Sequence, residues 1–406
     1  MKAFILFLLF IPVLIYAQEG FGFGEPDAFG FASPHGFSVR ISGEAGAEFT
    51  GFFDDFGSAE RIRETQAGDV FFGSLDFNAA GSTAEGVIRL NLALVFDGSS
   101  PIEIDEAFVR AFFGPAAITG GLRKLTWGKA DSFGPLDVIN PIDYSDLSKL
   151  SDPQNIKIGR PMIHVDWSLS SFSRLEAVFI PWFQGDKFAR SGRWAPSQVK
   201  ALLDAGINID GFYPETNTLE YAQAGLRFTT SLGSSDLGFQ YYFGRSPRPI
   251  VSFPSASSPL PAIHYDYFQQ IGADFARVIS GFNIRAEAGL NITGDLDEYE
   301  VVWSLGFDRD LFHRINLNLQ GTGRERGSTR ITGIISRSFL RDELELKATC
   351  IWGIEDRDFL FKPAIGWSRN DVSVELSAGF FGGDREGELG QYRDNSFLRV
   401  GLLYRF

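Results

Sequence analysis

From Phe37 to Phe406 the chain repeats one pattern, in which apolar and polar residues alternate over short segments. In the segment 37–49 the apolar residues fall mostly on odd positions, whereas Arg40, Glu44 and Glu48 share the even ones. Because successive side chains of a β-strand point to opposite faces, such a segment forms a strand with one apolar and one charged surface. The alternation returns at 88–96, 282–292, 315–320, 344–348 and 372–380. The pattern predicts an all-β protein.

The spacing of these segments separates two all-β architectures. A soluble antiparallel sheet with one wet face and a membrane barrel both give alternation. The segments here run about 10 to 14 residues, which suits a tilted transmembrane strand, whereas strands of globular proteins usually have about 5 to 6 residues. Tight links are expected near 81–83, 114–115, 170–172, 232–235, 279–281, 309–312, 340–342 and 370–371. Longer connections fall between them, at 53–69, 128–160, 184–219, 244–263 and 382–394.

Short turns that alternate with long loops are typical of a transmembrane antiparallel up-and-down β-barrel, with its short turns on the periplasmic side. Counting the hairpins predicts about 18 strands, with 16 as the alternative. Such a sheet must close on itself, since lipid offers no hydrogen-bond partner to the backbone at an open edge.

The composition agrees with a barrel that displays aromatic residues to lipid. The chain has 41 Phe and 45 Gly, and its formal net charge of −14 argues against nucleic acid as a partner. A single Cys among 406 residues excludes an internal disulfide bond.

The N-terminal residues have the layout of an export signal. Lys2 precedes an apolar run of about 14 residues that ends at Tyr16, and the polar residues Gln18 and Glu19 follow Ala17. We expect a signal peptide at 1–17, cleaved on export, a Gly/Phe-rich periplasmic leader at 18–36 and a barrel at 37–406. The leader is expected to be a tail, with a small plug in the lumen as the alternative. This layout predicts the outer membrane of a Gram-negative-type envelope.

The last segment, Asn395 to Phe406, ends in an aromatic residue after alternating apolar positions. It resembles the C-terminal signature by which outer-membrane proteins are recognised by the barrel assembly machinery. The resemblance implies that machinery as a partner and an assembly signal made of Val400, Leu402, Tyr404 and Phe406.

A second resemblance lies in the segment 127–144, which contains Trp-Gly-Lys-Ala-Asp at 127–131, Asp-Val-Ile-Asn-Pro at 137–141 and Asp-Tyr at 143–144. This block is similar to one in a family of largely uncharacterised outer-membrane barrels related to alginate-export porins. The match covers about residues 122 to 165. Some members of that family are thought to sit beside exporters of hydrophobic compounds, which implies an exporter as a partner.

The same stretch is too long for a tight turn. A long loop after an early strand can fold into the lumen and narrow it, and long loops are disproportionately functional. The residues expected in such a constriction are Trp127, Lys129, Asp131, Asp137, Asn140, Pro141 and Asp143. The alternative is an external loop with ordinary solvated charges. The scattered carboxylates lack the compact spacing of a calcium loop, so no metal is expected.

Charged residues at the alternate strand positions that face the barrel interior are expected to line a pore. They are Arg40, Glu44, Glu48, Arg89, Glu106, Arg110, Arg123, Asp166, Arg285, Glu287, Arg314, Glu345, Lys347 and Arg399. Both signs occur, so strong ion selectivity does not follow. A barrel of this strand number is too wide for side chains to fill, which favours a porin-like channel for small solutes or a hydrophobic ligand. The alternative is a closed barrel that binds a partner through surface loops.

We expect neither an enzyme nor a cofactor. The chain has four His, of which His164 and His264 are expected near the external rim, each two residues before an Asp. A hydrolase needs a nucleophile held by an oriented base, and the sequence supplies no such set.

Overall fold

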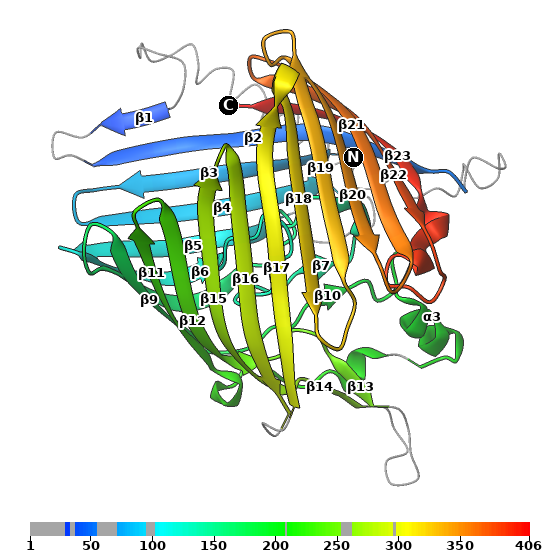
Figure 1. Ribbon diagram of the computed structural model, residues 1–406, viewed down its shortest axis with the longest axis horizontal. Coiled ribbons are helices and arrows are strands. Elements are labelled where there is room, and N and C mark those ends of the chain that lie inside the picture. The colour runs from blue at the N-terminus through cyan, green and yellow to red at the C-terminus, as the bar shows by residue number, and fades with distance from the viewer. Residues whose placement is uncertain are drawn as a thin grey trace.

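The computed structural model describes residues 29–32, 37–54, 71–94, 102–207, 209–252, 262–294 and 298–406. The predicted signal peptide lies outside these residues. One sheet of nineteen strands dominates the fold, and eighteen of them form a closed antiparallel barrel (Figure 1). The predicted all-β barrel of about 18 strands is therefore confirmed, and the alternative of 16 is wrong.

The barrel strands follow one another around the wall in chain order. They are β2 (Ser38–Phe52), β3 (Phe71–Ala80), β4 (Ala84–Leu94), β5 (Ile102–Phe113), β6 (Ala116–Arg123), β8 (Arg160–Ser168), β9 (Ser173–Ile180), β11 (Gln223–Leu232), β12 (Ser235–Arg245), β15 (Tyr267–Ile279), β16 (Phe282–Thr293), β17 (Glu298–Leu311), β18 (Ile315–Arg324), β19 (Arg330–Phe339), β20 (Leu344–Gly353), β21 (Asp358–Arg369), β22 (Val372–Gly382) and β23 (Phe397–Arg405).

The barrel closes where its last strand meets its first. β23 pairs with β2 in an antiparallel register from Glu44 opposite Arg405 to Phe52 opposite Phe397. The terminal residue completes this seam, because the Phe406 N–H donates to the Gly43 carbonyl at 3.0 Å and the Gly43 N–H donates back at 2.9 Å. No edge of the barrel is left without a partner strand at this junction.

The nineteenth strand, β1 (Phe29–Ala32), belongs to the predicted leader. It pairs antiparallel with the start of β2, with Phe29 opposite Ile41 and Ala32 opposite Ser38. These four residues thus form a strand and not part of a free tail. The other residues of the leader lie outside the described part of the chain.

Short turns at one end of the barrel alternate with long connections at the other, as the sequence predicts. The β15–β16 turn consists of Ser280 and Gly281, with φ of 52° and 81°. Two successive positive φ values match the right-handed twist of a hairpin, which explains why glycine follows serine here. The long connections hold β7 (Asp143–Tyr144), β10 (Lys187–Phe188), β13 (Ile250–Ser252), β14 (Ala262–His264), α3 (Ser197–Asp204) and the 3-10 turns η2 (Leu147–Lys149), η3 (Ile209–Phe212), η4 (Leu219–Tyr221) and η6 (Gly390–Asn395), while η5 (Phe312–Arg314) is in a short turn. Within the described residues, no helix is both long and apolar enough to span a membrane.

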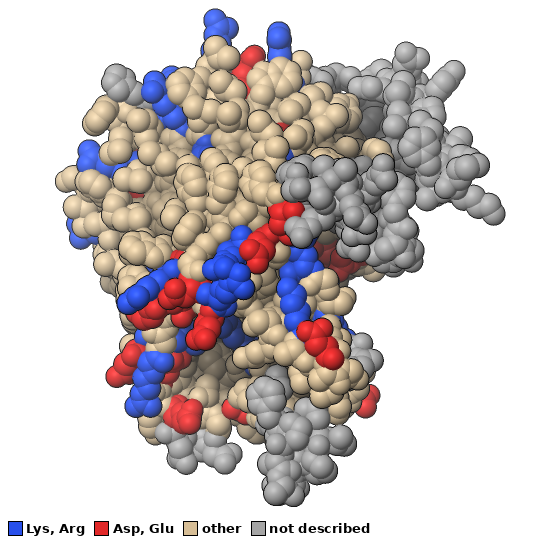
Figure 2. All heavy atoms as spheres, turned by 90° about the vertical axis from the view of Figure 1, so that its right-hand side faces the viewer, with Lys and Arg blue, Asp and Glu red and all other residues tan. Residues whose placement is uncertain are grey.

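The two faces of the wall differ in chemistry. On β15 the outward side chain of Ile271 is 54% exposed, whereas the inward Gln270 and Asp274 are buried. Uncharged side chains cover the upper part of the face in Figure 2, and charged ones gather in an oblique band below it. Phe243 and Tyr267 stack on the outer face near the strand ends, with ring centroids 6.2 Å apart. Such a surface is suited to hydrocarbon with an aromatic rim.

The outward face makes a depth-dependent prediction. Ile271→Arg, in the middle part of β15, should lower the free energy of unfolding by about 2–3 kcal/mol, because the charge would lie in hydrocarbon. Ile279→Arg, on the last residue of the same strand, should cost about 1 kcal/mol or less. Urea unfolding in lipid vesicles, followed by tryptophan fluorescence, measures both. Equal costs at the two positions would contradict a lipid-facing surface.

Candidate functional site

The connection between β6 and β8, residues 124–159, enters the barrel and reaches the opposite wall. Its backbone binds inward side chains of β16 and β18. β18 is eight strands away from β6 through the successive pairs of β8, β9, β11, β12, β15, β16 and β17, so it lies almost opposite β6 in a barrel of eighteen. The predicted inward course of this loop agrees with these contacts.

Carboxylate and amide side chains of the far wall hold the tip of the loop. Glu287 of β16 accepts hydrogen bonds from the backbone N–H groups of Ala130 at 2.7 Å, Leu136 at 3.3 Å and Lys129. Gln320 of β18 accepts from the Asp131 N–H at 2.9 Å. Each bond satisfies a backbone group that the loop removes from bulk water, so the wall supplies the partners that a strand would otherwise provide.

Two further amide side chains donate hydrogen bonds to carbonyl groups of the loop. Gln270 of β15 donates to the Pro135 carbonyl, and Gln240 of β12 donates to the Leu136 carbonyl, each at 2.8 Å. Gln240 also donates to Gln270 at 3.0 Å. The two glutamines are buried, so the loop is bound by a connected set of inward amides and not by one isolated contact.

Glycines on the inner wall make room for the apolar residues of the loop. Leu136 is fully buried, and a Cβ added at Gly272 or at Gly289 would lie 2.5 or 3.1 Å from its Cδ2 atom. Gly272 and Gly289 face each other across β15 and β16, so together they form a socket for Leu136. Trp127 is held in the same way, because a Cβ at Gly225 of β11 would lie 2.7 Å from the indole ring.

The base of the loop is tied by Asn140. Its Oδ1 accepts from the Leu125 N–H at 2.7 Å, and its Nδ2 donates to the carbonyls of Arg123 at 3.2 Å and Ile158 at 2.8 Å. The Pro141 carbonyl accepts from the Ile158 N–H at 2.9 Å. The buried amide of Asn140 thus joins the beginning and the end of the loop.

Ion pairs hold the other predicted loop residues. Asp131 contacts Arg285 of β16 and Asn318 of β18, and Asp137 pairs with the buried Lys157. Asp143 lies 2.8 Å from Lys187. Burial opposes ionisation of Asp143, but hydrogen bonds from Lys187 and Ser145 outweigh it and lower its pKa.

A second external connection, between β9 and β11, is joined to this loop at Asp186. Asp186 Oδ1 accepts from the Ile142 N–H at 2.8 Å, and its own N–H donates to the Pro247 carbonyl at 2.8 Å. Beside it β7 and β10 pair in parallel. Burial raises the pKa of Asp186 to about 6, so the carboxyl at this junction of three connections loses its proton at a higher pH than an exposed aspartate.

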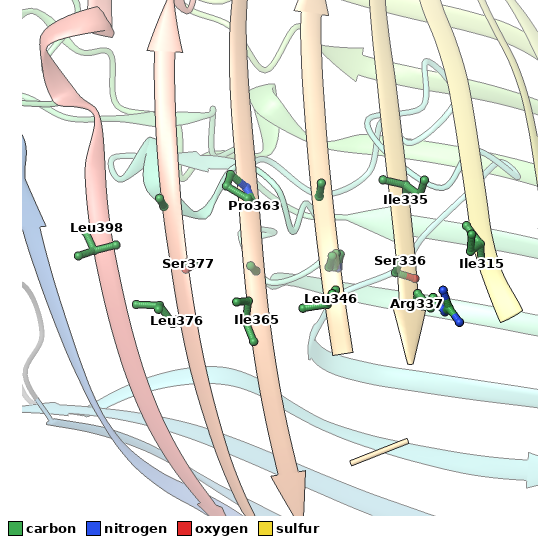
Figure 3. Close-up of a pocket in the computed structure, with 14 residues that line it drawn as sticks. Ile315, Ile335, Ser336, Arg337, Leu346, Pro363, Ile365, Leu376, Ser377 and Leu398 are labelled. Atoms are coloured by element: carbon green, nitrogen blue, oxygen red, sulfur yellow. The ribbon is translucent and has the colours of Figure 1, made fainter. Parts of the chain in front are cut away.

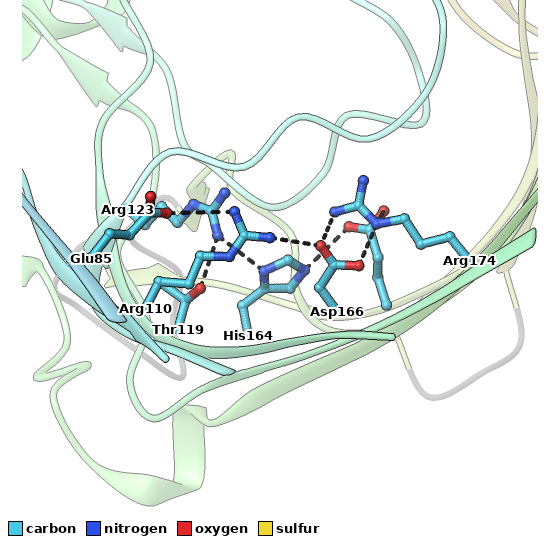
Figure 4. A network of polar contacts seen from close by, with 8 residues as sticks. Glu85, Arg110, Thr119, Arg123, His164, Asp166 and Arg174 are labelled. Carbon is cyan, nitrogen blue, oxygen red and sulfur yellow. Dashed lines mark hydrogen bonds and ion pairs between the residues drawn. The ribbon is translucent and has the colours of Figure 1, made fainter. Parts of the chain in front are cut away.

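The inner wall around β5, β6, β8 and β9 carries a network of charged and polar side chains (Figure 4). Arg110 Nη2 lies 3.0 Å from Asp166 Oδ2, and Arg174 contacts the same carboxylate. His164, almost fully buried in the middle of β8, has Nε2 3.2 Å from Glu176 and Nδ1 3.1 Å from Arg123. The expected place of His164 at the external rim is wrong, and its carboxylate partner is Glu176, not Asp166.

Most of the predicted pore-lining charges are paired along the wall. Arg89 lies 2.6 Å from Asp76 and 2.7 Å from Glu106. Glu44 lies 3.7 Å from Arg405, Glu48 lies 3.2 Å from Arg399, and Arg285 lies 2.7 Å from Asp308. Arg40, Glu345 and Lys347 lie on the inward parity of β2 and β20. Basic and acidic side chains therefore lie beside each other at several places on the inner wall.

One predicted member of the lining is placed elsewhere. Arg314 is not on a strand but in η5, in the turn between β17 and β18, where its φ is 57°. Its side chain is 78% exposed and lies 3.8 Å from Asp342 of a neighbouring turn. The alternation of β18 extends back to Arg314 and the tight link is expected to end at residue 312, which is why the sequence predicts Arg314 on the wall.

The residues that bind the loop were mostly missed. The inward-facing strand positions also hold Gln240, Gln270 and Gln320. Their amides are uncharged, so a pattern of charged residues does not reveal them. The socket glycines also lie at inward-facing positions, and glycine carries no polar or apolar signal. Among the described residues, no group of three or more His, Cys, Asp or Glu is placed to hold a metal ion.

Comparisons with known proteins identify the fold. No family model and no curated protein sequence matches the chain. The structure is similar to OccAB4 of Acinetobacter baumannii, with a TM-score of 0.53 at 7% identity over 92% of this chain and 100% of that chain. It also resembles Salmonella typhi OmpF, solved as a complex with daunomycin, with a TM-score of 0.46 at 10% identity over 92% and 99% of the two chains.

A third similar structure is OmpT, an outer membrane protein of Vibrio cholerae, with a TM-score of 0.43 at 10% identity over 91% of this chain and 99% of that chain. The likeness to OccAB4 shows a shared porin-like barrel fold. The resemblance of the 127–141 motif to barrels related to alginate-export porins stays a prediction.

The glycine socket can be tested by filling it. Gly272→Val should displace Leu136 and lower the free energy of unfolding by about 1–3 kcal/mol, because overpacking forces the neighbouring atoms to move. The released loop should be cut by trypsin after Lys129, which mass spectrometry detects. Gly401→Val is the matched control, since Gly401 is an inward strand glycine with no atom within 4 Å of an added Cβ. Equal cutting of both variants would contradict the socket.

The junction at Asp186 should depend on pH. Because its folded-state pKa is raised, the stability contributed by Asp186 is complete at low pH and is lost as the pH rises through about 6. Hydrogen exchange of the segments 142–144 and 186–188, corrected for intrinsic rates, should therefore be slower at pH 5 than at pH 7.5. Asp186→Asn should remove this difference. A difference that persists in the variant would assign it to another group.

Proposed function

We propose that the protein is a passive channel of the outer membrane whose lumen is narrowed by the β6–β8 loop. The observation that carries the proposal is the set of hydrogen bonds between the loop tip and Glu287, Gln270 and Gln320 on the far wall. A barrel of eighteen strands encloses more space than its inward side chains fill, and a loop held across that space leaves a smaller passage.

The apolar outer face supports the membrane location. Outward side chains such as Ile271, Leu305 and Val301 are 54%, 58% and 43% exposed, which is costly in water and favourable in lipid. At the C-terminus, Val400, Leu402 and Tyr404 point outward and are 45%, 50% and 43% exposed. An exposed apolar row of this kind fits the proposed recognition of the last strand by the barrel assembly machinery.

The lining supports passage of small polar solutes more than strong selection by charge. Arg89, Arg110 and Arg285 each lie close to at least one carboxylate, so the wall presents paired charges and polar amides. A solute that enters such a lumen meets donors and acceptors of both kinds. We therefore propose a pore selective by size, with a weak preference between cations and anions.

Single-channel recording in planar bilayers tests the channel and its constriction together. Wild-type protein should give discrete conductance steps, and Gly272→Val and Glu287→Ala should give larger steps, because each removes a different anchor of the loop. Gly401→Val should conduct like wild type. Swelling of liposomes in sugars of graded size should show a higher size limit for the two released variants.

The outcomes separate the proposal from its rivals. Silence of every variant in the bilayer would refute the channel and favour a closed barrel whose loops bind an external partner. Conductance that is equal in wild type and in both released variants would keep the channel but refute the constriction.

A further inference from the structure

The outer face of the barrel carries a groove across β18 to β23, with a volume of about 480 Å³ (Figure 3). Its floor is made of three small residues side by side on adjacent strands. Ala348 of β20 lies opposite Pro363 of β21, and the register of β21 with β22 brings Ala378 next to Pro363. Ile335 and Leu398 stand at the two ends of this row.

The groove lies where the pairing between two neighbouring strands is interrupted. Proline has no N–H and cannot donate to the ladder, and the pairing of β21 with β22 is interrupted at Lys362 and Pro363. Leu346, Ile365 and Leu376 form the next row toward the short-turn end, and they are 41%, 48% and 43% exposed. Phe361 and Phe380 form the row on the other side of Pro363, with stacked rings 6.4 Å apart. The groove is thus apolar along its length.

One basic residue with an outward side chain lines this apolar groove. Arg337 lines it and lies in register with Leu346, on the outward parity of β19, two residues before the short turn. Its guanidinium carbon lies 4.5 Å from the ring centroid of Phe339. Its Nε atom is buried and has no hydrogen-bond partner, and the side chain forms no ion pair within the part of the chain that is described.

Arg337 is one of several basic residues on this part of the outer surface. Arg277 and Arg309 occupy the same position, two residues before the end of β15 and β17, on the outward parity. Arg309 lies over the ring of Phe282 at 4.2 Å. Arginine at this depth sits where lipid phosphates lie, and each basic residue attracts anionic lipid.

We propose that the groove together with Arg337 binds one anionic phospholipid of the periplasmic leaflet. An acyl chain occupies the apolar floor over Ala348, Pro363 and Ala378, and the lipid phosphate accepts a hydrogen bond from Arg337. The inference goes beyond the channel function and rests only on the membrane placement proposed above. A second copy of the chain fits less well, because a two-fold contact through this groove would bring the Arg337 side chains of the two copies toward each other and supply no carboxylate.

The probes are phosphatidylglycerol and phosphatidylcholine, which differ in net charge but share acyl chains. The mature full-length protein is folded into vesicles of an equal mixture, extracted in mild detergent, and the retained lipid is counted by native mass spectrometry. Wild-type protein should retain one phosphatidylglycerol in preference to phosphatidylcholine. Arg337→Gln should reduce that preference by roughly fivefold, the factor that one basic residue near a membrane surface typically contributes.

Two matched controls localise the effect. Ala348→Phe should fill the groove and reduce retention of both lipids, whereas Ala288→Phe, an outward alanine of β16 away from the groove, should not. Arg277→Gln removes the same charge at the same depth on β15 and should retain lipid as wild type does. Heat-modifiable migration on gels and unchanged single-channel conductance verify that each variant is folded.

Three results would overturn the site. Equal retention by Arg337→Gln and wild type would remove the phosphate contact. An equal loss in Arg277→Gln would mean that the lipid is held by diffuse attraction and not by the groove. Full retention by Ala348→Phe would show that no acyl chain lies over the alanine floor. None of these results bears on the channel, which the conductance of the same samples measures separately.

Discussion

The structure depends on one constraint, that no backbone N–H or C=O can be left unpaired in hydrocarbon. Eighteen strands answer it by pairing in sequence around a ring, and the bonds between Gly43 and Phe406 complete the ring where the two ends of the chain meet. Closure fixes the direction of every side chain, because alternate residues must face either lipid or lumen. The apolar outer face and the polar inner wall are therefore two consequences of the same geometry.

Closure also creates a wide interior, and the β6–β8 loop uses the inner wall as its hydrogen-bonding surface. A loop inside a barrel would bury unpaired backbone groups if the wall were apolar. Glu287 and Gln320 accept from its N–H groups, while Gln240 and Gln270 donate to its carbonyls. The polar side chains of the inner wall are therefore what allows the loop to lie inside the barrel. The glycines opposite Leu136 set where along the wall the loop can rest.

The architecture could be predicted from the sequence because period-two alternation, segment length and turn residues all repeat many times. The sequence predicts every short turn to within a few residues, since a break in alternation beside Gly, Ser or Asp is a local signal. Arg314 is misplaced because the sequence predicts the tight link at 309–312, whereas the η5 turn extends to Arg314. The sequence predicts Asn140 as a loop residue, but its hydrogen bonds to the Leu125 N–H and the Ile158 carbonyl depend on the folded positions of those groups. Partners that are far apart in sequence leave no local pattern.

Two arginines show that the face on which a strand residue lies determines what its side chain contacts. Arg285 of β16 faces the lumen, pairs with Asp308 and holds Asp131 of the loop. Arg337 of β19 faces outward, lies over Phe339 and has no carboxylate beside it among the described residues. Both residues stand near the short-turn end of a strand, and a shift of one position would exchange their surroundings. One face therefore uses the charge to order a loop, and the other leaves it available to a lipid phosphate.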